Sequence, residues 1–125
     1  MLVDTDVIIW FLRGHAKAAR VLEDLNNPVI SVITYIELVQ GMRNKAELRA
    51  FRATLRGWNI PIAPVNEDVC SRAVYYMEEY FLSGGLRLAD ALIAATAATM
   101  VLPLLTGNVK HYKAIKDLEL KRFKP

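Results

Sequence analysis

Residues 1–11, MLVDTDVIIWF, join a short apolar run to a helix-like pattern and carry Asp4 and Asp6 at the junction. A short apolar run of this kind is typical of a buried strand, and the spacing of apolar residues over 7–13 predicts a helix. An unpaired carboxylate is costly in such surroundings. Asp4 is therefore the first candidate functional residue, and Asp6 either caps the helix or contributes to the same site.

Two other acids lie in similar surroundings further along the chain. Glu37 is within VISVITYIELVQG (29–41) and Asp90 is within LRLADALIAATA (86–97). Like charges brought close together raise one another's pKa or require a cation between them. A hard divalent ion such as Mg²⁺ or Mn²⁺ prefers oxygen ligands. If the fold gathers Asp4, Glu37 and Asp90, the sequence predicts a metal site suited to phosphodiester hydrolysis.

Apolar strands that alternate with amphipathic segments predict an α/β fold with a parallel sheet. Ligands in such sheets collect at the carboxyl ends of the strands, where Asp4 and the Thr106-Gly107-Asn108 turn are expected. The predicted strands are 2–5, 29–32, 60–65, 101–105 and 119–122, and the predicted helices are 7–13, 17–25, a segment through 34–39, 47–58, a segment capped by Asn66, 88–100, and a short turn over 110–115.

The chain has 125 residues, of which 54% are hydrophobic, and no repeat or linker divides it. We expect one domain over residues 1–125. No apolar run reaches the ~18 residues of a membrane span. Acids within the first apolar stretch argue against a secretory signal. The single cysteine, Cys70, is expected to be a small buried hydrophobe, and a lone cysteine suits a reducing cytoplasm.

The formal net charge is +3, but the rest of the chain is more basic than this value once the acids proposed for the site are left out. With Asp4, Asp6, Glu37 and Asp90 set aside, 16 basic residues face nine acids, a balance of +7. A basic surface around an acidic, metal-binding hollow suits a nuclease, because cations hold the phosphate backbone. The candidate RNA-binding residues are Arg87, Lys110, His111 and Lys113. The stripe of Arg49, Arg52 and Arg56 is either a solvated helix face or a surface for RNA.

Four segments in order, LVDTDVII, SVITYIELVQG, LRLADALIAATA and LLTGNVKHY, make the chain resemble the PIN-domain ribonucleases. Within that family it is most similar to the VapC toxins of toxin-antitoxin pairs. The resemblance covers essentially the whole chain. It implies a PIN-like three-layer α/β/α sandwich with a central, mainly parallel sheet of four to five strands.

The resemblance also implies that Asp4, Glu37 and Asp90 are catalytic acids that bind Mg²⁺ or Mn²⁺, with Asp6 beside the first of them. Many family members have a fourth acid where this chain has Asn108, whose amide is a weaker ligand, so the number of metal ions stays open. Which acid orients the attacking water also stays open. Supporting hydrogen bonds are expected from Thr5, Ser31 and Thr106.

The implied partners are RNA, a VapB-type antitoxin lying along the helices of residues 33–58, and a second copy of the chain in a homodimer or a toxin-antitoxin hetero-oligomer. The leading hypothesis is a metal-dependent endoribonuclease held silent by the antitoxin. The alternative is a catalytically weak or inactive PIN module that acts by binding RNA or antitoxin. A phosphatase or small-nucleotide hydrolase that uses the same acids is a third reading.

Overall fold

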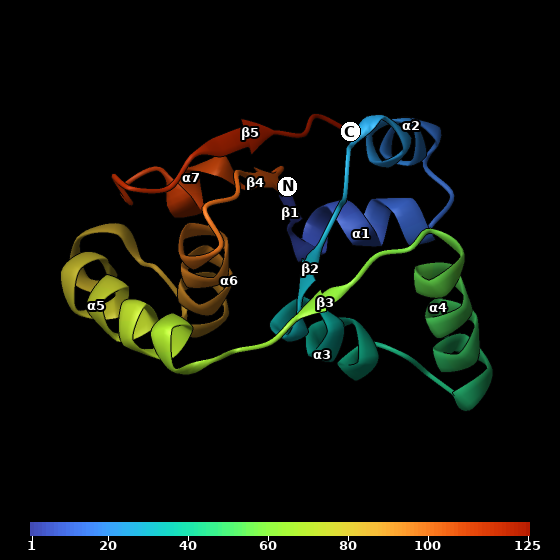
Figure 1. Ribbon diagram of the computed structural model, residues 1–125, viewed down its shortest axis with the longest axis horizontal. Helices are drawn as coiled ribbons and strands as arrows, with labels where there is room; N and C mark the ends of the chain where they lie inside the picture. The colour runs from blue at the N-terminus through green and yellow to red at the C-terminus, as the bar shows by residue number, and fades with distance from the viewer.

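A parallel sheet of five short strands runs through the computed structural model, which describes residues 1–125 (Figure 1). The strands are β1 (Leu2–Val3), β2 (Ile30–Ser31), β3 (Ile62–Ala63), β4 (Leu104–Thr106) and β5 (Leu120–Arg122). Strands β1, β4 and β5 pair in that order, and β2 pairs with β3. A parallel bridge between Leu2 and Val29 joins the two groups, giving the order β3-β2-β1-β4-β5.

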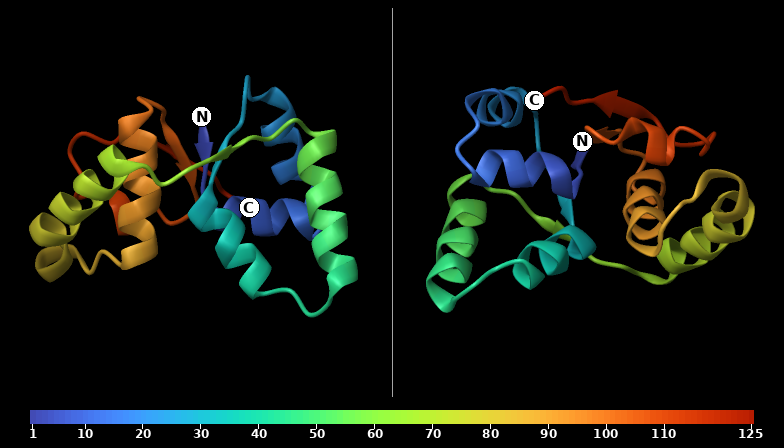
Figure 2. Two further views of the ribbon diagram at one scale, coloured as in Figure 1. Left: turned by 60° about the horizontal axis from the view of Figure 1, so that its bottom comes forward. Right: turned by 180° about the vertical axis from the view of Figure 1, so that it is seen from behind.

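Helices cover both faces of this sheet, as Figures 1 and 2 show. They are α1 (Thr5–Leu12), α2 (Ala16–Asp24), α3 (Val32–Gln40), α4 (Lys45–Gly57), α5 (Glu67–Gly84), α6 (Leu88–Thr99) and α7 (Val109–Tyr112). Successive strand residues point to opposite faces. Leu2 accordingly packs in a core with α5 and α6, whereas Val3 packs in a second core with α1, α2 and α4. The expected three-layer α/β/α sandwich is confirmed.

The packing of the central helix α6 fixes the position of Asp90. Its residues Ala91, Ile93, Ala94, Ala95 and Ala97 are buried, as expected for a helix packed on several sides. Small side chains let it lie close to α5, with which it makes the most extensive contact between elements. Asp90 belongs to its first turn and is half-buried, so tight packing of the rest of α6 fixes where that carboxylate lies.

Three local expectations are wrong. The first helix begins at Thr5, so Asp4 is its N-cap and Asp6 is not. Asp4 has an extended backbone and its side chain accepts a hydrogen bond from Thr5 N, which are the properties of an N-cap. The expected strand 101–105 begins only at Leu104, because Val101 reverses the chain after α6. Cys70 is exposed on α5 and not buried.

Val101 offers a stability prediction. It follows the C-cap of α6 with a φ of 55°, and 87% of it is exposed. A β-branched residue is strained in this left-handed conformation, which glycine adopts freely. We expect Val101→Gly to raise the free energy of unfolding by about 1 kcal/mol in chemical denaturation. Asn59→Gly, at a φ of 53°, is the matched control and should gain less, because asparagine tolerates this region. A loss of stability in Val101→Gly would contradict the argument.

No helix of the structure is both long enough and apolar enough to cross a bilayer.

Candidate active site

Asp4 is the buried centre of a group of polar side chains at the carboxyl ends of β1 and β4. It is 4% exposed. Its Oδ1 accepts from Thr5 N at 2.8 Å, and its Oδ2 accepts from Thr106 Oγ1 at 2.8 Å and from Tyr112 OH at 3.0 Å. Because β1 and β4 are paired neighbours, Thr106 at the end of β4 lies next to Asp4. Three donors therefore fix the orientation of this carboxylate.

Asp90 reaches the same place from the first turn of α6. Its Oδ1 lies 3.4 Å from Tyr112 OH, so a single buried hydroxyl stands between Asp90 and Asp4. Its Oδ2 accepts from Arg87 N at 3.3 Å, which caps the helix. His111 Nδ1 lies 3.9 Å from the same Oδ2. The structure thus brings together the first and third predicted acids, and it brings His111 beside them.

Glu37 joins the group through a threonine. Thr5 Oγ1 donates to Glu37 Oε1 at 2.7 Å and lies 2.9 Å from Thr34 Oγ1. Thr5 directly follows Asp4, so one residue of chain connects two acids that are far apart in sequence. Glu37 itself is exposed on α3, although its neighbours in the sequence are apolar. Its carboxylate has the freedom to move that Asp4 lacks.

Asp6, two residues after Asp4, is half-buried. Its Oδ2 accepts from Gly107 N at 2.8 Å, while its buried Oδ1 has no hydrogen-bond partner. A Cβ on residue 107 would lie 2.5 Å from Asp6 Oδ2, so only glycine allows this close approach. Asp6 therefore anchors the loop after β4 and presents an unsatisfied oxygen, and a buried unsatisfied oxygen normally calls for a partner.

The electrostatics of the group favour a bound cation. Burial, together with the charge of Asp6, raises the pKa of Asp4 to about 6 although the hydrogen bonds from Thr106, Thr5 and Tyr112 lower it. Burial also raises the pKa of Asp6. The pKa of Tyr112 lies above its ordinary value because of burial and the charge of Asp4, so its hydroxyl stays a donor. No lysine or arginine forms an ion pair with any of the four acids.

A hard divalent cation fits the donors of this group. They are carboxylate oxygens with no cysteine, and Asp6 Oδ1 is left without a partner. As the side chains stand, however, no three acidic, histidine or cysteine residues lie close enough to hold one ion. Hydroxyls occupy the spaces between the acids instead, notably that of Tyr112. Binding therefore requires a carboxylate to rotate, and exposed Glu37 is the freest to do so.

The other predicted residues divide between the site and its surroundings. Thr5 and Thr106 hydrogen-bond to the acids as expected. Ser31 does not, since its Oγ accepts from Ile33 N and caps α3. Asn108 is exposed, and its backbone N donates to Thr106 Oγ1. The exposed residues Arg87, Lys110 and Lys113 make no ion pair.

The sequence reasoning missed two side chains that hold the acids in place. Thr34 lies one helical turn before Glu37, a spacing that was available as a signal. Tyr112 had no such signal, because its aromatic ring reads as part of the core. Its ring does pack in the core with α5 and α6, while its hydroxyl lies between Asp4 and Asp90.

Comparisons with known proteins show which family the whole chain resembles. The PIN domain family model matches residues 1–117. Ribonuclease VapC10 of Mycobacterium tuberculosis is 37% identical over 123 residues, covering 95% of this chain and 90% of that protein. Ribonuclease VapC1 of Methanocaldococcus jannaschii is 30% identical, and the match covers 97% of this chain and 85% of that protein. A toxin-antitoxin complex from Klebsiella pneumoniae has a chain with a TM-score of 0.79 and 30% identity, covering 94% and 93%. A chain of VapBC-1 from nontypeable Haemophilus influenzae has a TM-score of 0.80 and 27% sequence identity, and the match covers 97% of this chain and 96% of that chain.

Proposed function

The chain belongs to the PIN-domain family, and from that premise we propose that it is a VapC-type endoribonuclease toxin acting as one PIN domain over residues 1–125. The observation that carries the proposal is the arrangement of Asp4. A buried carboxylate at the edge of the sheet shares the Tyr112 hydroxyl with Asp90 and is linked to Glu37 through Thr5. No lysine or arginine forms an ion pair with these acids. This arrangement suits hydrolysis that needs no protein nucleophile.

We propose Mg²⁺ or Mn²⁺ as the cofactor, held by Asp4 and Asp90 with Glu37 and with Asp6 as a further ligand. Such an ion supplies a Lewis acid and a lowered pKa for bound water. The chain contributes the rest. Thr106 and Tyr112 keep Asp4 in one orientation, and Gly107 does the same for Asp6. Asn108 is neutral at a position where an acid would favour a second ion, which supports one ion over two.

A VapB-type antitoxin is the proposed inhibitor. One of the similar structures is a toxin-antitoxin complex, and another is VapBC-1 from nontypeable Haemophilus influenzae. A hollow of about 500 Å³ lies between α1, α3 and α4, and Glu37 is on its wall. Its apolar lining includes Ile9, Leu12, Leu38 and Met42. An amphipathic antitoxin segment that fills this hollow would lie along α3 and α4, the helices of residues 33–58, and would place a basic side chain near the acids.

We further propose an oligomeric state, a cellular location and a set of RNA contacts for this protein. We propose a homodimer, alone or within a toxin-antitoxin hetero-oligomer, because Ile36, Leu82 and Leu88 are exposed large apolar side chains. We propose that the protein acts in the cytoplasm, where RNA is available and a lone thiol such as Cys70 stays reduced. Arg87, Lys110, His111 and Lys113 lie on segments next to the acids and are proposed to contact RNA.

The test is cleavage of a panel of defined RNAs by antitoxin-free protein with Mg²⁺, Mn²⁺ or EDTA. Asp90→Asn, purified in the same way, reveals any contaminating nuclease. We expect cleavage that requires metal and is lost in Asp90→Asn. Cleavage of mononucleotides but not RNA would indicate the phosphatase reading instead.

A binding module without catalysis is the second candidate function. It is favoured by Asn108 and by the absence of a ready three-ligand arrangement. Wild-type protein that binds RNA or antitoxin but cuts nothing with either metal would support this candidate over the nuclease.

A further inference from the structure

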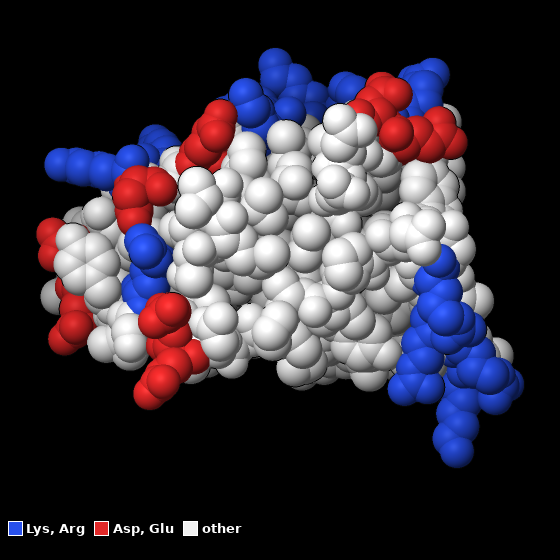
Figure 3. Space-filling view, in the orientation of Figure 1, with Lys and Arg blue, Asp and Glu red and all other residues white.

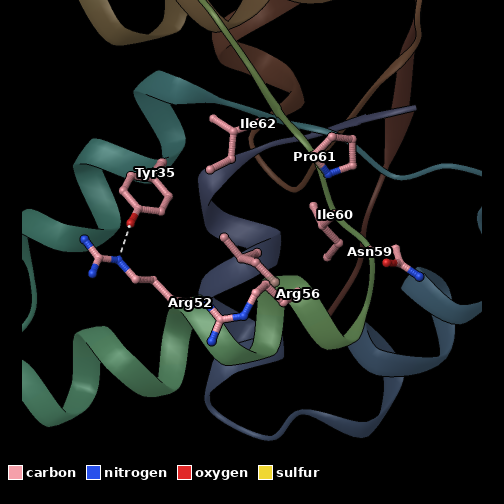
Figure 4. Close-up of a pocket in the computed structure, with 8 residues that line it drawn as sticks. Tyr35, Arg52, Arg56, Asn59, Ile60, Pro61 and Ile62 are labelled. Carbon is pink, nitrogen blue, oxygen red and sulfur yellow. Dashed lines mark hydrogen bonds between the residues drawn. The ribbon is translucent and has the colours of Figure 1, made fainter.

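A second hollow, which we call the arginine hollow, lies between α3, α4 and β3, at the edge of the sheet away from β5 (Figure 4). Its volume is about 780 Å³. The side chains that matter for its chemistry are Tyr35, Arg52 and Arg56 with Ile60, Pro61 and Ile62. None of the four acids of the candidate active site lines it, and no acid of any kind does.

The basic side chains of this hollow have no counter-charge within the chain. Helix α4 carries Lys45, Arg49, Arg52 and Arg56, all of them exposed, and none of the four forms an ion pair. Figure 3 shows a blue group with no red side chain among it over α4 on the face in view, and Glu47, the one acid of α4, pairs with Arg43. Arg52 and Arg56 are one helical turn apart and both face the hollow (Figure 4). Two guanidinium groups at this spacing, neither of them in an ion pair, suit two neighbouring phosphates.

One of these arginines is held in place. Arg52 Nε donates to Tyr35 OH at 3.1 Å, which leaves its terminal N–H groups available (Figure 4). The ring of Tyr35 is in turn packed against Phe51, with 5.2 Å between the ring centroids. A fixed guanidinium loses less conformational entropy on binding than a free one. The hollow is therefore partly organised before any ligand arrives.

The other wall is apolar and open. Ile62 is 41% exposed and Pro61 is exposed beside it. An aromatic ring, an arginine and an apolar surface around phosphate-binding cations are the features on which unpaired bases of single-stranded RNA stack. A volume of this size accommodates a nucleotide.

An added peptide strand fits the same edge poorly. Strand β3 is the edge of the sheet, but it has only two residues and lies between Pro61 and Pro64. Proline has no N–H to donate, so this edge offers few main-chain hydrogen bonds to an incoming strand. Recognition here has to rely on side chains, and those side chains are cationic and aromatic.

We propose that the arginine hollow is a subsite for single-stranded RNA outside the cleavage site, in which Arg52 and Arg56 bind phosphates and Tyr35 and Ile62 contact a base. The proposal rests on the proposed function, because it assigns a further contact to the same RNA. It explains why α4 keeps an unpaired row of cations next to an apolar edge.

The test uses the full chain carrying Asp90→Asn, so that RNA is bound and not cut. The probe is a fluorescent single-stranded RNA of mixed sequence, and its Kd is measured by anisotropy over a series of salt concentrations. Arg52→Ala/Arg56→Ala should weaken binding about tenfold and lower the slope of log Kd against log salt by about 1.4, as expected for two lost phosphate contacts on a single strand. The matched control, Arg20→Ala/Lys116→Ala, removes the same charge from exposed positions outside the hollow and should change Kd less than twofold.

Tyr35→Phe keeps the ring and removes the hydroxyl that holds Arg52, so it should weaken binding less than the double variant. Unchanged Kd and salt slope in Arg52→Ala/Arg56→Ala would overturn the subsite, while metal-dependent cleavage by the wild type would leave the proposed function intact. A double variant with normal RNA binding and a weakened antitoxin complex would make the hollow a protein-binding site and also overturn the proposal. A wild type that neither binds nor cleaves RNA would overturn both.

Discussion

Asp4→Asn is expected to abolish RNA cleavage while making the metal-free protein more stable. The activity should fall by more than about 100-fold, because even groups that only orient metal ligands are worth 10–100-fold. Asparagine still caps α1 through its side-chain oxygen. Its amide N–H₂ faces Thr106 and Tyr112, whose hydroxyls can also accept. The substitution therefore removes the charge and keeps most of the local structure.

The gain in stability follows from the pKa of Asp4, which burial raises from 3.8 to about 6. The folded protein holds this proton more tightly than the unfolded chain, so stability falls as pH rises from about 4 through 6. Above pH 6 the charged carboxylate costs about 1–3 kcal/mol. Asp4→Asn removes that cost, and its advantage should be largest at pH 7.5 and about half as large at pH 5, where the unfolded carboxyl is already mostly ionised.

The measurement is thermal unfolding of both proteins in EDTA at pH 7.5 and pH 5, next to cleavage assays with Mg²⁺ or Mn²⁺. Asp24→Asn, at the exposed end of α2, is the control and should change neither quantity. A variant less stable than wild type at both pH values would mean that the hydrogen bonds of the carboxylate outweigh its charge. Wild-type cleavage by Asp4→Asn would remove Asp4 from the catalytic group.

The fold could be predicted from the sequence because its pattern is simple. Apolar runs mark the strands, and α6 reads as a central helix through its alanines and leucines, as the structure confirms. Strand lengths were harder. Pro61 and Pro64 restrict β3 to two residues, and Val101 adopts a left-handed conformation that no apolar pattern reveals. Local backbone constraints thus decide where strands begin and end.

The acids of the candidate site could be predicted from the sequence, but the hydrogen bonds that Tyr112 and Gly107 donate to them could not. Asp4, Asp90 and Glu37 stood out because carboxylates are rare in apolar segments. The contact between Tyr112 and Asp4 spans 108 residues, and that between Gly107 and Asp6 spans 101. Such contacts depend on the pairing of β1 with β4, which a sequence pattern does not specify. The sequence allows Asp6 to be either a helix cap or a metal ligand, and the structure excludes only the cap.

Gly107→Ala tests the remaining role of Asp6 and is expected to impair the site with the fold retained. The new Cβ would lie 2.5 Å from Asp6 Oδ2 and 3.3 Å from Phe123 O, so the carboxylate has to turn away and lose its bond to Gly107 N. The loop after β4 also carries Thr106, which holds Asp4. We expect cleavage and Mn²⁺ affinity to fall about 10–100-fold and the free energy of unfolding to fall by about 1–3 kcal/mol.

The matched control is Gly57→Ala at the end of α4, where a Cβ meets nothing within 4 Å and stability should change by less than about 1 kcal/mol. A double-mutant cycle with Asp6→Ala separates the two effects of the clash. If Gly107→Ala acts through Asp6, it should cost little further Mn²⁺ affinity once Asp6 is gone, while the contact with Phe123 still lowers stability. Equal losses of affinity in both backgrounds would instead place the effect on Thr106 and Asp4, and Asp6 would then serve only to anchor the loop.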